Sequence, residues 1–292
     1  PSINDYMNHK KQNGVNVFFA SINSTHKITS IKSSIKKHFY DDETIVGKKF
    51  CLLIGNEYEI PSKLEKDKLS NDDTGSSDKF YTLYDDEYCY DLYIGRMSSG
   101  ANDGESVETR RNNIRKQLLK TIIYENDVKY KCGYGKAITI GSNEGQGIGD
   151  NNEADYEHMN IIAEKLRGMG ISNVDGYYDD LNNKGAHKID NDKSGDPNNV
   201  DIRDEINGGI GHMFYVGHAD VTYLGTSKFS TSDLKHLVNY NMFPSCFIVG
   251  CLAGSFDSSR LSLAEGMVIG NQEDDIPTGT IMAIGSTVLQ QW

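Results

Sequence analysis

Short apolar runs bounded by turn-forming residues recur along the chain of 292 residues. Most of these runs are continuous and do not alternate with polar residues. Continuous runs are typical of parallel strands that helices cover on both faces. We therefore predict strands at 15–21, 50–55, 91–96, 135–142, 174–178, 212–217, 245–250 and 279–286.

Helical spacing of apolar residues marks the stretches between several of these strands. One stretch opens with NNEADYEH, and acidic residues in a first turn complement the helix dipole. The pattern predicts helices at 28–38, 105–126, 153–169, 200–207, 231–240 and 260–269. This alternation of strands and helices indicates an α/β fold with mostly parallel, doubly wound sheets.

Two polar stretches, 63–79 and 179–201, predict long surface loops. A division of the chain is expected near 126–134, where the long helix ends in YENDVKYKCGYG. We therefore predict two packed subdomains, an N-terminal α/β subdomain at 1–130 and a C-terminal subdomain at 131–292.

The net charge of −12 changes the range of partners to expect. An acidic surface argues against binding to nucleic acid or to an anionic membrane, and it suits basic substrates, calcium or solubility alone. No apolar run reaches the roughly 18 residues that a membrane span needs. The chain begins Pro1-Ser2-Ile3 without a Met or a visible signal peptide, so we expect a mature or excised form.

Three reactive side chains follow predicted strands directly. Glu144 comes after AITIGSN, His218 after MFYVG and Cys251 after CFIVG. Functional groups gather beyond the carboxyl ends of strands in open α/β sheets. If neighbouring strands carry these residues, all three converge on one edge of the sheet.

This set of side chains has a chemical interpretation. A thiol is mostly protonated at neutral pH, a nearby imidazole can deprotonate it, and a carboxylate can orient the imidazole. Such a site performs cysteine acyl transfer, most often peptide hydrolysis. A cysteine after an apolar strand is also common as a small core residue, and a histidine in a Gly-His-Ala loop is often structural. The pattern alone leaves both interpretations open.

Several blocks of sequence carry a family resemblance over nearly the whole chain. They are LLIGNEYEIPSK, YDLYIGRMS, TIIYEND, ITIGSNEGQGIGDNNEADYEHMNIIAEKL, INGGIGHMFYVGHADVTYLGTSKFSTSDLKHLVN, FIVGCLAGSFD, AEGM, PTGTIMAIGST and QQW. In order and spacing they resemble the gingipain-like cysteine peptidases, and above all the Arg-specific gingipains. The resemblance implies a caspase-like fold, polypeptide substrates, a secreted or cell-surface location, and a pro-segment or flanking domains outside this chain.

The resemblance also implies catalytic roles. Cys251 matches the nucleophile, His218 the general base and acid, and Glu144 the acidic residue that assists the histidine. The backbone N–H groups of Ala219 and Cys251 match the oxyanion hole. Position 219 is more usually glycine in the family, so activity here depends on whether alanine tolerates the backbone angle.

The family match further implies a pocket for the side chain on the amino side of the cleaved bond, the P1 residue. Asp155 matches the acid at its base, Val216 and Val249 match its walls, and Trp292 matches the aromatic that covers it. A carboxylate pairs best with a guanidinium, so the match predicts arginine at P1, with lysine as the alternative. Without the match, Asp155 resembles an ordinary acid at a helix N-terminus.

The segment DNDKSGDPNNVD at 190–201 spaces its oxygen donors like an EF-hand calcium loop. It departs from that pattern because its twelfth residue is aspartate, a proline interrupts it and no strong helix precedes it. A solvated turn is the alternative interpretation. The chemistry itself requires no cofactor. The calcium ligands of the first interpretation are Asp190, Asp192, Ser194, Asp196 and Asp201.

Two rival functions remain on sequence grounds. A catalytically silent relative would use the same cleft for binding or adhesion, and another acyl-transfer enzyme would act as a peptide ligase or amidase. An unprocessed zymogen is a further alternative, although the sequence identifies no blocking segment.

Overall fold

The computed structural model describes most of the chain. The described residues are 2–23, 26–39, 41, 47–66, 74–84, 91–101, 104–126, 135–145, 147, 151–179 and 196–290. Within this part of the chain, no helix is long and apolar enough to cross a membrane.

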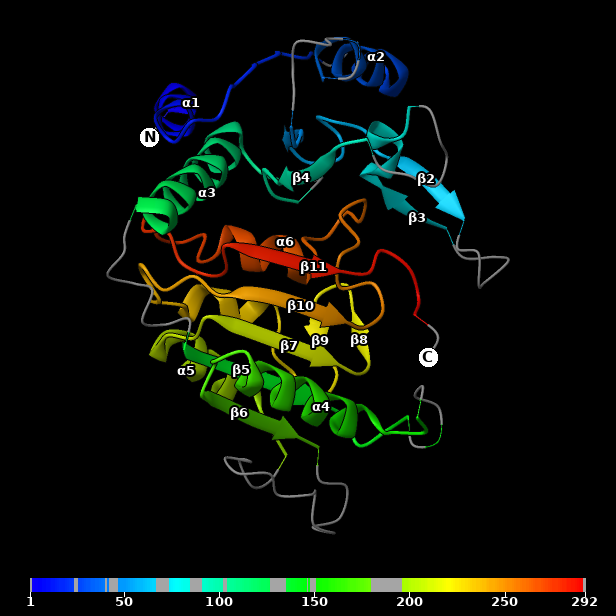
Figure 1. Cartoon of the computed structure of the whole chain (residues 1–292), viewed down its shortest axis with the longest axis vertical. Helices are drawn as coiled ribbons and strands as arrows, with labels where there is room; N and C mark the ends of the chain where they lie inside the picture. The colour runs from blue at the N-terminus through cyan, green and yellow to red at the C-terminus, as the bar shows by residue number, and fades with distance from the viewer. Residues whose placement is uncertain are drawn as a thin grey trace.

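Five parallel strands form the central sheet, in the order β11-β10-β7-β5-β6 (Figure 1). Their apolar runs were predicted from the sequence, and all five predictions are confirmed. The strands are β5 (Lys136–Gly141), β6 (Asn173–Tyr178), β7 (His212–Val216), β10 (Ser245–Val249) and β11 (Met282–Gly285).

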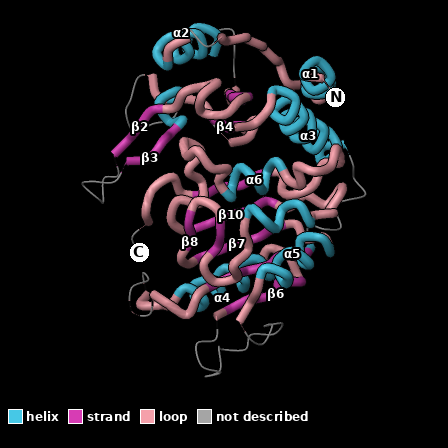
Figure 2. The backbone as a smooth tube through the Cα atoms, turned by 180° about the vertical axis from the view of Figure 1, so that it is seen from behind, coloured by secondary structure: helices cyan, strands magenta, loops and turns pink. Residues whose placement is uncertain are grey.

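Helices cover both faces of this sheet, as continuous apolar strands require. Helix α4 (Asp155–Gly168) lies in front of the sheet in Figure 1, whereas α5 (Asn199–Gly208) and α6 (Leu263–Ile269) lie on the other face, seen in Figure 2. Alternate residues of β7 point to the two faces. Met213 joins the large core on the α5 and α6 side, and Phe214 packs against the cluster under α4.

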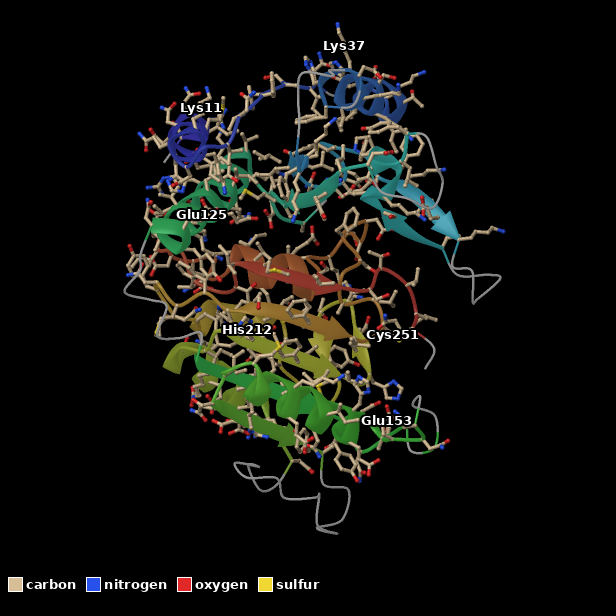
Figure 3. The ribbon with its side chains drawn as sticks, viewed as in Figure 1. Lys11, Lys37, Glu125, Glu153, His212 and Cys251 are labelled. Carbon is tan, nitrogen blue, oxygen red and sulfur yellow. The ribbon has the colours of Figure 1, made fainter. Side chains whose placement is uncertain are left out.

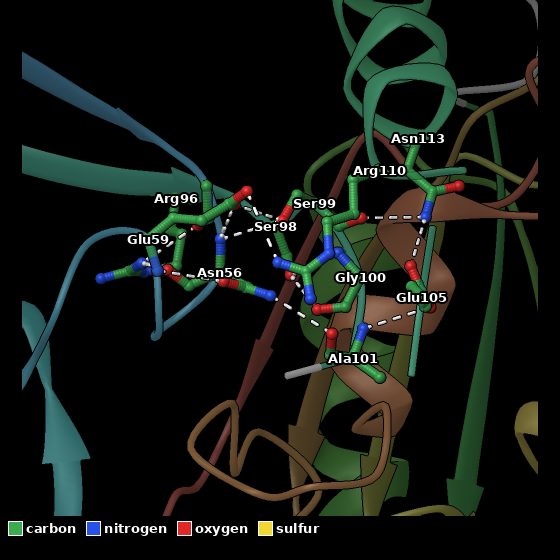
Figure 4. A network of polar contacts seen from close by, with 11 residues as sticks. Asn56, Glu59, Arg96, Ser98, Ser99, Gly100, Ala101, Glu105, Arg110 and Asn113 are labelled. Atoms are coloured by element: carbon green, nitrogen blue, oxygen red, sulfur yellow. Dashed lines mark hydrogen bonds and ion pairs between the residues drawn. The ribbon is translucent and has the colours of Figure 1, made fainter. Parts of the chain in front are cut away.

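A second parallel pair, β1 (Phe50–Ile54) and β4 (Tyr93–Met97), lies in the N-terminal part of the chain. The ends of both strands enter one polar network (Figure 4). Backbone N–H of Asn56 donates to Glu59 and to Ser99, and Asn113 of α3 (Val107–Asn126) donates to the carbonyl of Ser99. These contacts fix the loops after β1 and β4 against α3.

Two buried lysines of α3 join this part of the chain to the central sheet. The Nζ atom of Lys116 donates to the carbonyl oxygen of Asn271, and that of Lys120 donates to the carbonyls of Val268 and Thr280. Burial lowers the pKa of both ammonium groups. Since 127–134 lies outside the described residues, the boundary at 130 stays a prediction.

Three sequence predictions differ from the structure, and one helix was missed. Residues 15–21 join no sheet among the described residues, and Phe18 packs on the aromatic rings of His38 and Phe39 instead. The helix expected at 231–240 is the shorter 3₁₀ helix η3 (Thr231–His236), and the loop expected at 63–79 contains a hairpin, β2 (Lys63–Lys66) with β3 (Thr74–Ser77). The first helix was not predicted.

The remaining elements are short or lie at the chain's start. They are α1 (Ile3–Gln12), α2 (Ile28–Phe39), η1 (Asp78–Thr82), β8 (Ala219–Asp220) and β9 (Tyr223–Leu224). Helix α1 packs on α3, where His9 Nε2 lies 2.8 Å from a carboxylate oxygen of Glu125. The helix also begins at a capping box of Ser2 and Asp5, a local signal that the prediction overlooked.

Candidate active site

Three neighbouring strands lead directly into the predicted catalytic residues. Strand β7 lies between β10 and β5. His218 and Cys251 come two residues after the ends of β7 and β10, and Glu144 comes three residues after β5. Figure 3 shows Cys251 at this edge, with His212 toward the opposite end of β7. The expected convergence on one edge is therefore what the fold produces.

His218 and Glu144 form an ion-pair contact at this edge. The Nε2 atom of His218 lies 2.5 Å from Oε2 of Glu144, and their side chains are 65% and 51% exposed. Because water screens charges at such exposure, the contact orients the imidazole more than it stabilises the fold. The side chain of His218 is open to an incoming substrate.

Three cysteines lie within the described residues, and all three thiols are free. Burial raises the pKa of Cys51 to about 11 and that of Cys246 to about 12, which keeps both thiols protonated and inert. Cys251, like Cys51, is only partly buried, whereas Cys246 is fully buried. The backbone N–H of Gln290 lies 3.3 Å from the Sγ atom of Cys251.

Close backbone approach shapes the loops around the thiol. A Cβ atom on Gly250 would lie 2.8 Å from the Cβ of Ala219 and from the carbonyl oxygen of Gly217, so the loops after β7 and β10 can meet only through glycine. Leu252, directly after the thiol, has a φ of 58°, a conformation that costs L-residues energy. Cys251 therefore sits on a sharp turn, and strained backbone of this kind is common at functional sites.

Ala219 begins β8, pairs with Leu224 and does not adopt the left-handed backbone region. Alanine is consequently no obstacle where the family more usually has glycine. The oxyanion-hole role of its N–H group stays a prediction.

Asp155 opens α4 beside the same edge and is only 6% exposed. The hydroxyl of Ser142 donates to its Oδ2 atom, and its backbone N–H donates to the carbonyl of Glu144 at 3.0 Å. Burial raises the pKa of Asp155, although the Ser142 hydrogen bond acts in the opposite direction. A buried carboxylate with one side-chain donor is suited to receive a cation.

The other predicted pocket residues have different surroundings. Val249 is 46% exposed, whereas Val216 is buried against Met159 and Tyr178. Trp292 lies outside the described residues.

The predicted calcium loop is described only at its end, since Asp190, Asp192 and Ser194 lie outside the described residues. Asp201 accepts a hydrogen bond from the backbone N–H of Asn198 at 2.9 Å, as the third residue of a capping box on α5. Asp196 precedes that helix. Among the described residues, no group of three potential metal ligands gathers.

Two residues that the sequence pattern did not indicate, Ser142 and Tyr215, also contact this site. Ser142 joins Asp155 to Glu144, and the Tyr215 hydroxyl donates to the carbonyl oxygen of His218 at 2.5 Å. Both lie in or directly after apolar runs, where a serine or tyrosine resembles ordinary strand sequence. No local signal separates them from core residues.

Comparison with known proteins gives one consistent result. The family model described as peptidase family C25 matches residues 1–291. Gingipain R2 and gingipain R1 of Porphyromonas gingivalis are each 30% identical over 294 residues, which cover 99% of this chain but only 36% and 26% of those relatives. The chain thus spans about a third or less of the curated relatives' length.

Solved structures agree with this result. The crystal structure of the Arg-specific cysteine proteinase gingipain R (RgpB) superposes with a TM-score of 0.81 at 30% identity, covering 99% of this chain and 60% of that one. The complex of the RgpB pro- and mature domains gives the same TM-score and covers 62% of its matching chain. The caspase-like α/β fold is therefore confirmed.

Proposed function

Because the chain belongs to peptidase family C25, we propose that it is a cysteine endopeptidase that hydrolyses peptide bonds after arginine, with lysine as a secondary P1 residue. The observation that carries this proposal is the His218–Glu144 pair at the ends of the neighbouring strands β7 and β5, with β7 also beside β10, the strand that leads into Cys251.

The proposed reaction uses the groups at this edge. The Nε2 atom of His218 faces Glu144, so the Nδ1 atom would accept the thiol proton. The sulfur attacks the substrate carbonyl carbon while backbone N–H groups of Ala219 and Cys251 stabilise the oxyanion. His218 then protonates the leaving amine, and water hydrolyses the acyl-enzyme, which returns the thiol.

Arginine specificity rests on Asp155 in this proposal. Its carboxylate is buried at the same edge, where a guanidinium can bind it with two parallel hydrogen bonds. Val249, exposed at the end of β10, would border the pocket, with Val216 beneath it and Trp292 over the bound side chain. The Arg-specific proteinase of similar structure supports this assignment.

Covalent labelling tests the proposal. An arginyl chloromethyl ketone should modify Cys251 stoichiometrically, as located by peptide mass spectrometry, whereas the matching aspartyl reagent should not react. Cys246 and Cys51 serve as internal controls, since both are thiols of the same chain. Failure of the arginyl reagent to label Cys251 would instead favour a silent binding domain.

Three further properties follow as proposals. The residues before and after 130–131 act as two packed subdomains, a pro-segment of the same protein regulates the site, and the protein works outside the cell. Structural calcium at 190–201 is a fourth. A thermal melt with excess EGTA separates it from a solvated turn, because an unchanged midpoint would exclude the calcium site.

A further inference from the structure

Ser142 occupies a fixed place between the proposed specificity and catalytic residues. It directly follows β5 and is 4% exposed. Its backbone N–H donates to the carbonyl of Val216 at 3.3 Å, and its carbonyl accepts from the N–H of Tyr156 at 3.0 Å. The main chain of Ser142 is therefore anchored to both β7 and α4.

The hydroxyl of Ser142 makes two hydrogen bonds of opposite sense. It donates its single proton to Oδ2 of Asp155 and accepts from the backbone N–H of Glu144 at 3.2 Å. A backbone N–H can only donate, so the hydroxyl proton is directed to the carboxylate. The backbone N–H of Asp155 completes the unit by donating to the carbonyl of Glu144 at 3.0 Å.

Each bond has a separate consequence. The donor on Asp155 fixes one carboxylate oxygen and favours its ionised form, which burial and the neighbouring Glu144 disfavour. The acceptor for the N–H of Glu144 fixes the main chain from which that carboxylate reaches His218. One hydroxyl is thus hydrogen-bonded both to the proposed specificity residue Asp155 and to the main chain of Glu144.

We propose that Ser142 is a positioning residue that holds the Asp155 carboxylate and the Glu144 main chain as one unit, so that binding of a P1 cation and orientation of His218 depend on the same hydroxyl. This inference rests on the proposed function. It assigns Ser142 no contact with the reacting atoms.

Binding of benzamidine, a cationic probe of an acidic pocket, separates the specificity part from catalysis. We expect Ser142→Ala to weaken its inhibition constant about tenfold at pH 7, because a hydrogen bond to a charged group is lost. The inhibition constant should also be measured against pH. In Ser142→Ala, the loss of benzamidine binding on the acid side (the acid limb) should begin at higher pH, because the donor that favours ionised Asp155 is gone. A merely structural serine would not move that limb.

Double variants show which partner Ser142 acts through. Asp155→Asn should abolish benzamidine inhibition, and adding Ser142→Ala should change nothing further. With a P1-Arg peptide, Ser142→Ala should also lower kcat, and by less when Glu144→Ala is already present. Ser245→Ala is the matched control, because Ser245 is a buried serine on the same sheet whose hydroxyl bonds His212 at 2.7 Å.

The outcomes are distinct. The inference is overturned if Ser142→Ala keeps the wild-type inhibition constant and acid limb while Asp155→Asn no longer binds benzamidine. That result leaves the proposed function intact. A wild-type protein that neither cleaves after arginine nor binds benzamidine overturns both. If Ser142→Ala fails to fold, Ser142→Cys replaces it, because cysteine is nearly the same size as serine and its thiol is a weaker donor. Ser142→Cys should shift the inhibition constant and the acid limb in the same direction by a smaller amount. Wild-type values in Ser142→Cys would overturn the inference.

Discussion

The Nε2 atom of His218 lies 2.5 Å from a carboxylate oxygen of Glu144, although the two residues follow different strands. The contact depends on the direct pairing of β5 with β7. It fixes which ring nitrogen of His218 faces the carboxylate.

Removing this carboxylate should affect catalysis without affecting the fold. We expect Glu144→Gln to lower kcat about tenfold, less than the roughly hundredfold or more of a group that transfers the proton itself, because Glu144 only orients His218 and the pair is exposed. The unfolding free energy should change by less than about 0.5 kcal/mol. Glu153→Gln is the control, since Glu153 pairs with His158 at 3.1 Å. Equal kcat values for Glu144→Gln and wild type would contradict the orienting role.

A second prediction concerns the backbone that carries the histidine. Tyr215 is fully buried, and its hydroxyl donates to the carbonyl of His218 and accepts from the N–H of Thr226 at 3.3 Å. Tyr215→Phe should cost about 1 kcal/mol of unfolding free energy and lower kcat severalfold, with little change in KM.

Tyr177→Phe is the matched control for that variant. Tyr177 is a buried tyrosine on β6, at the edge of the same sheet, and its hydroxyl donates to Glu205 at 2.5 Å. The Tyr177→Phe variant should lose about as much unfolding free energy as Tyr215→Phe and keep the wild-type kcat. If both variants lose kcat equally, Tyr215 has no particular role in placing His218.

The sequence predicted the strand ends because each combines an apolar run with a following glycine or glycine-rich turn. Cys251, His218 and Glu144 were found in this way, and Asp155 through a family resemblance. The order of strands decides whether they meet, and no local pattern contains it. The register of β5, β7 and β10 supplies the missing information.

A third prediction concerns Glu265, whose carboxylate accepts from the hydroxyls of Ser98 and Ser262 at 2.7 Å each. Burial raises its pKa to about 7, from 4.5. The folded chain thus holds this proton more tightly than the unfolded chain. The resulting stability is complete below pH 4.5 and is lost as the pH rises through 7.

Glu265→Gln should remove this dependence. The loss between pH 4.5 and 8 should amount to at most about 3 kcal/mol of unfolding free energy in the wild type. Urea unfolding across that range measures it, and Glu164→Gln, on the exposed side of α4, is the control. A constant difference between wild type and Glu265→Gln at all pH values would contradict the shifted pKa.

A fourth prediction tests the link through α3. Lys120→Ala should lower the unfolding free energy by about 3 kcal/mol or more, because it leaves a cavity and takes the donor from two buried carbonyls. Lys165→Ala, on the exposed face of α4, should change it by less than about 0.5 kcal/mol. Similar losses of unfolding free energy in both variants would show that the buried side chain of Lys120 stabilises the fold no more than an exposed lysine does.

Contacts between distant segments determine several features that local sequence patterns do not contain. Helix α1 is held by His9 against Glu125, and Lys120 lies in a helix that resembles a polar surface helix until its carbonyl partners are known. Residues 15–21 have strand-like composition, yet Phe18 finds aromatic partners on α2. At residues 15–21 packing therefore overrides local propensity.

Turnover of two fluorogenic peptides that differ only in arginine or aspartate at P1 tests the central claim most directly. The proposed site predicts hydrolysis of the arginine peptide at a kcat/KM at least a hundredfold higher, roughly the discrimination that a buried charge pair provides. It also predicts complete loss of this activity in Cys251→Ala. Equal turnover of both peptides, or activity retained in Cys251→Ala, would contradict it.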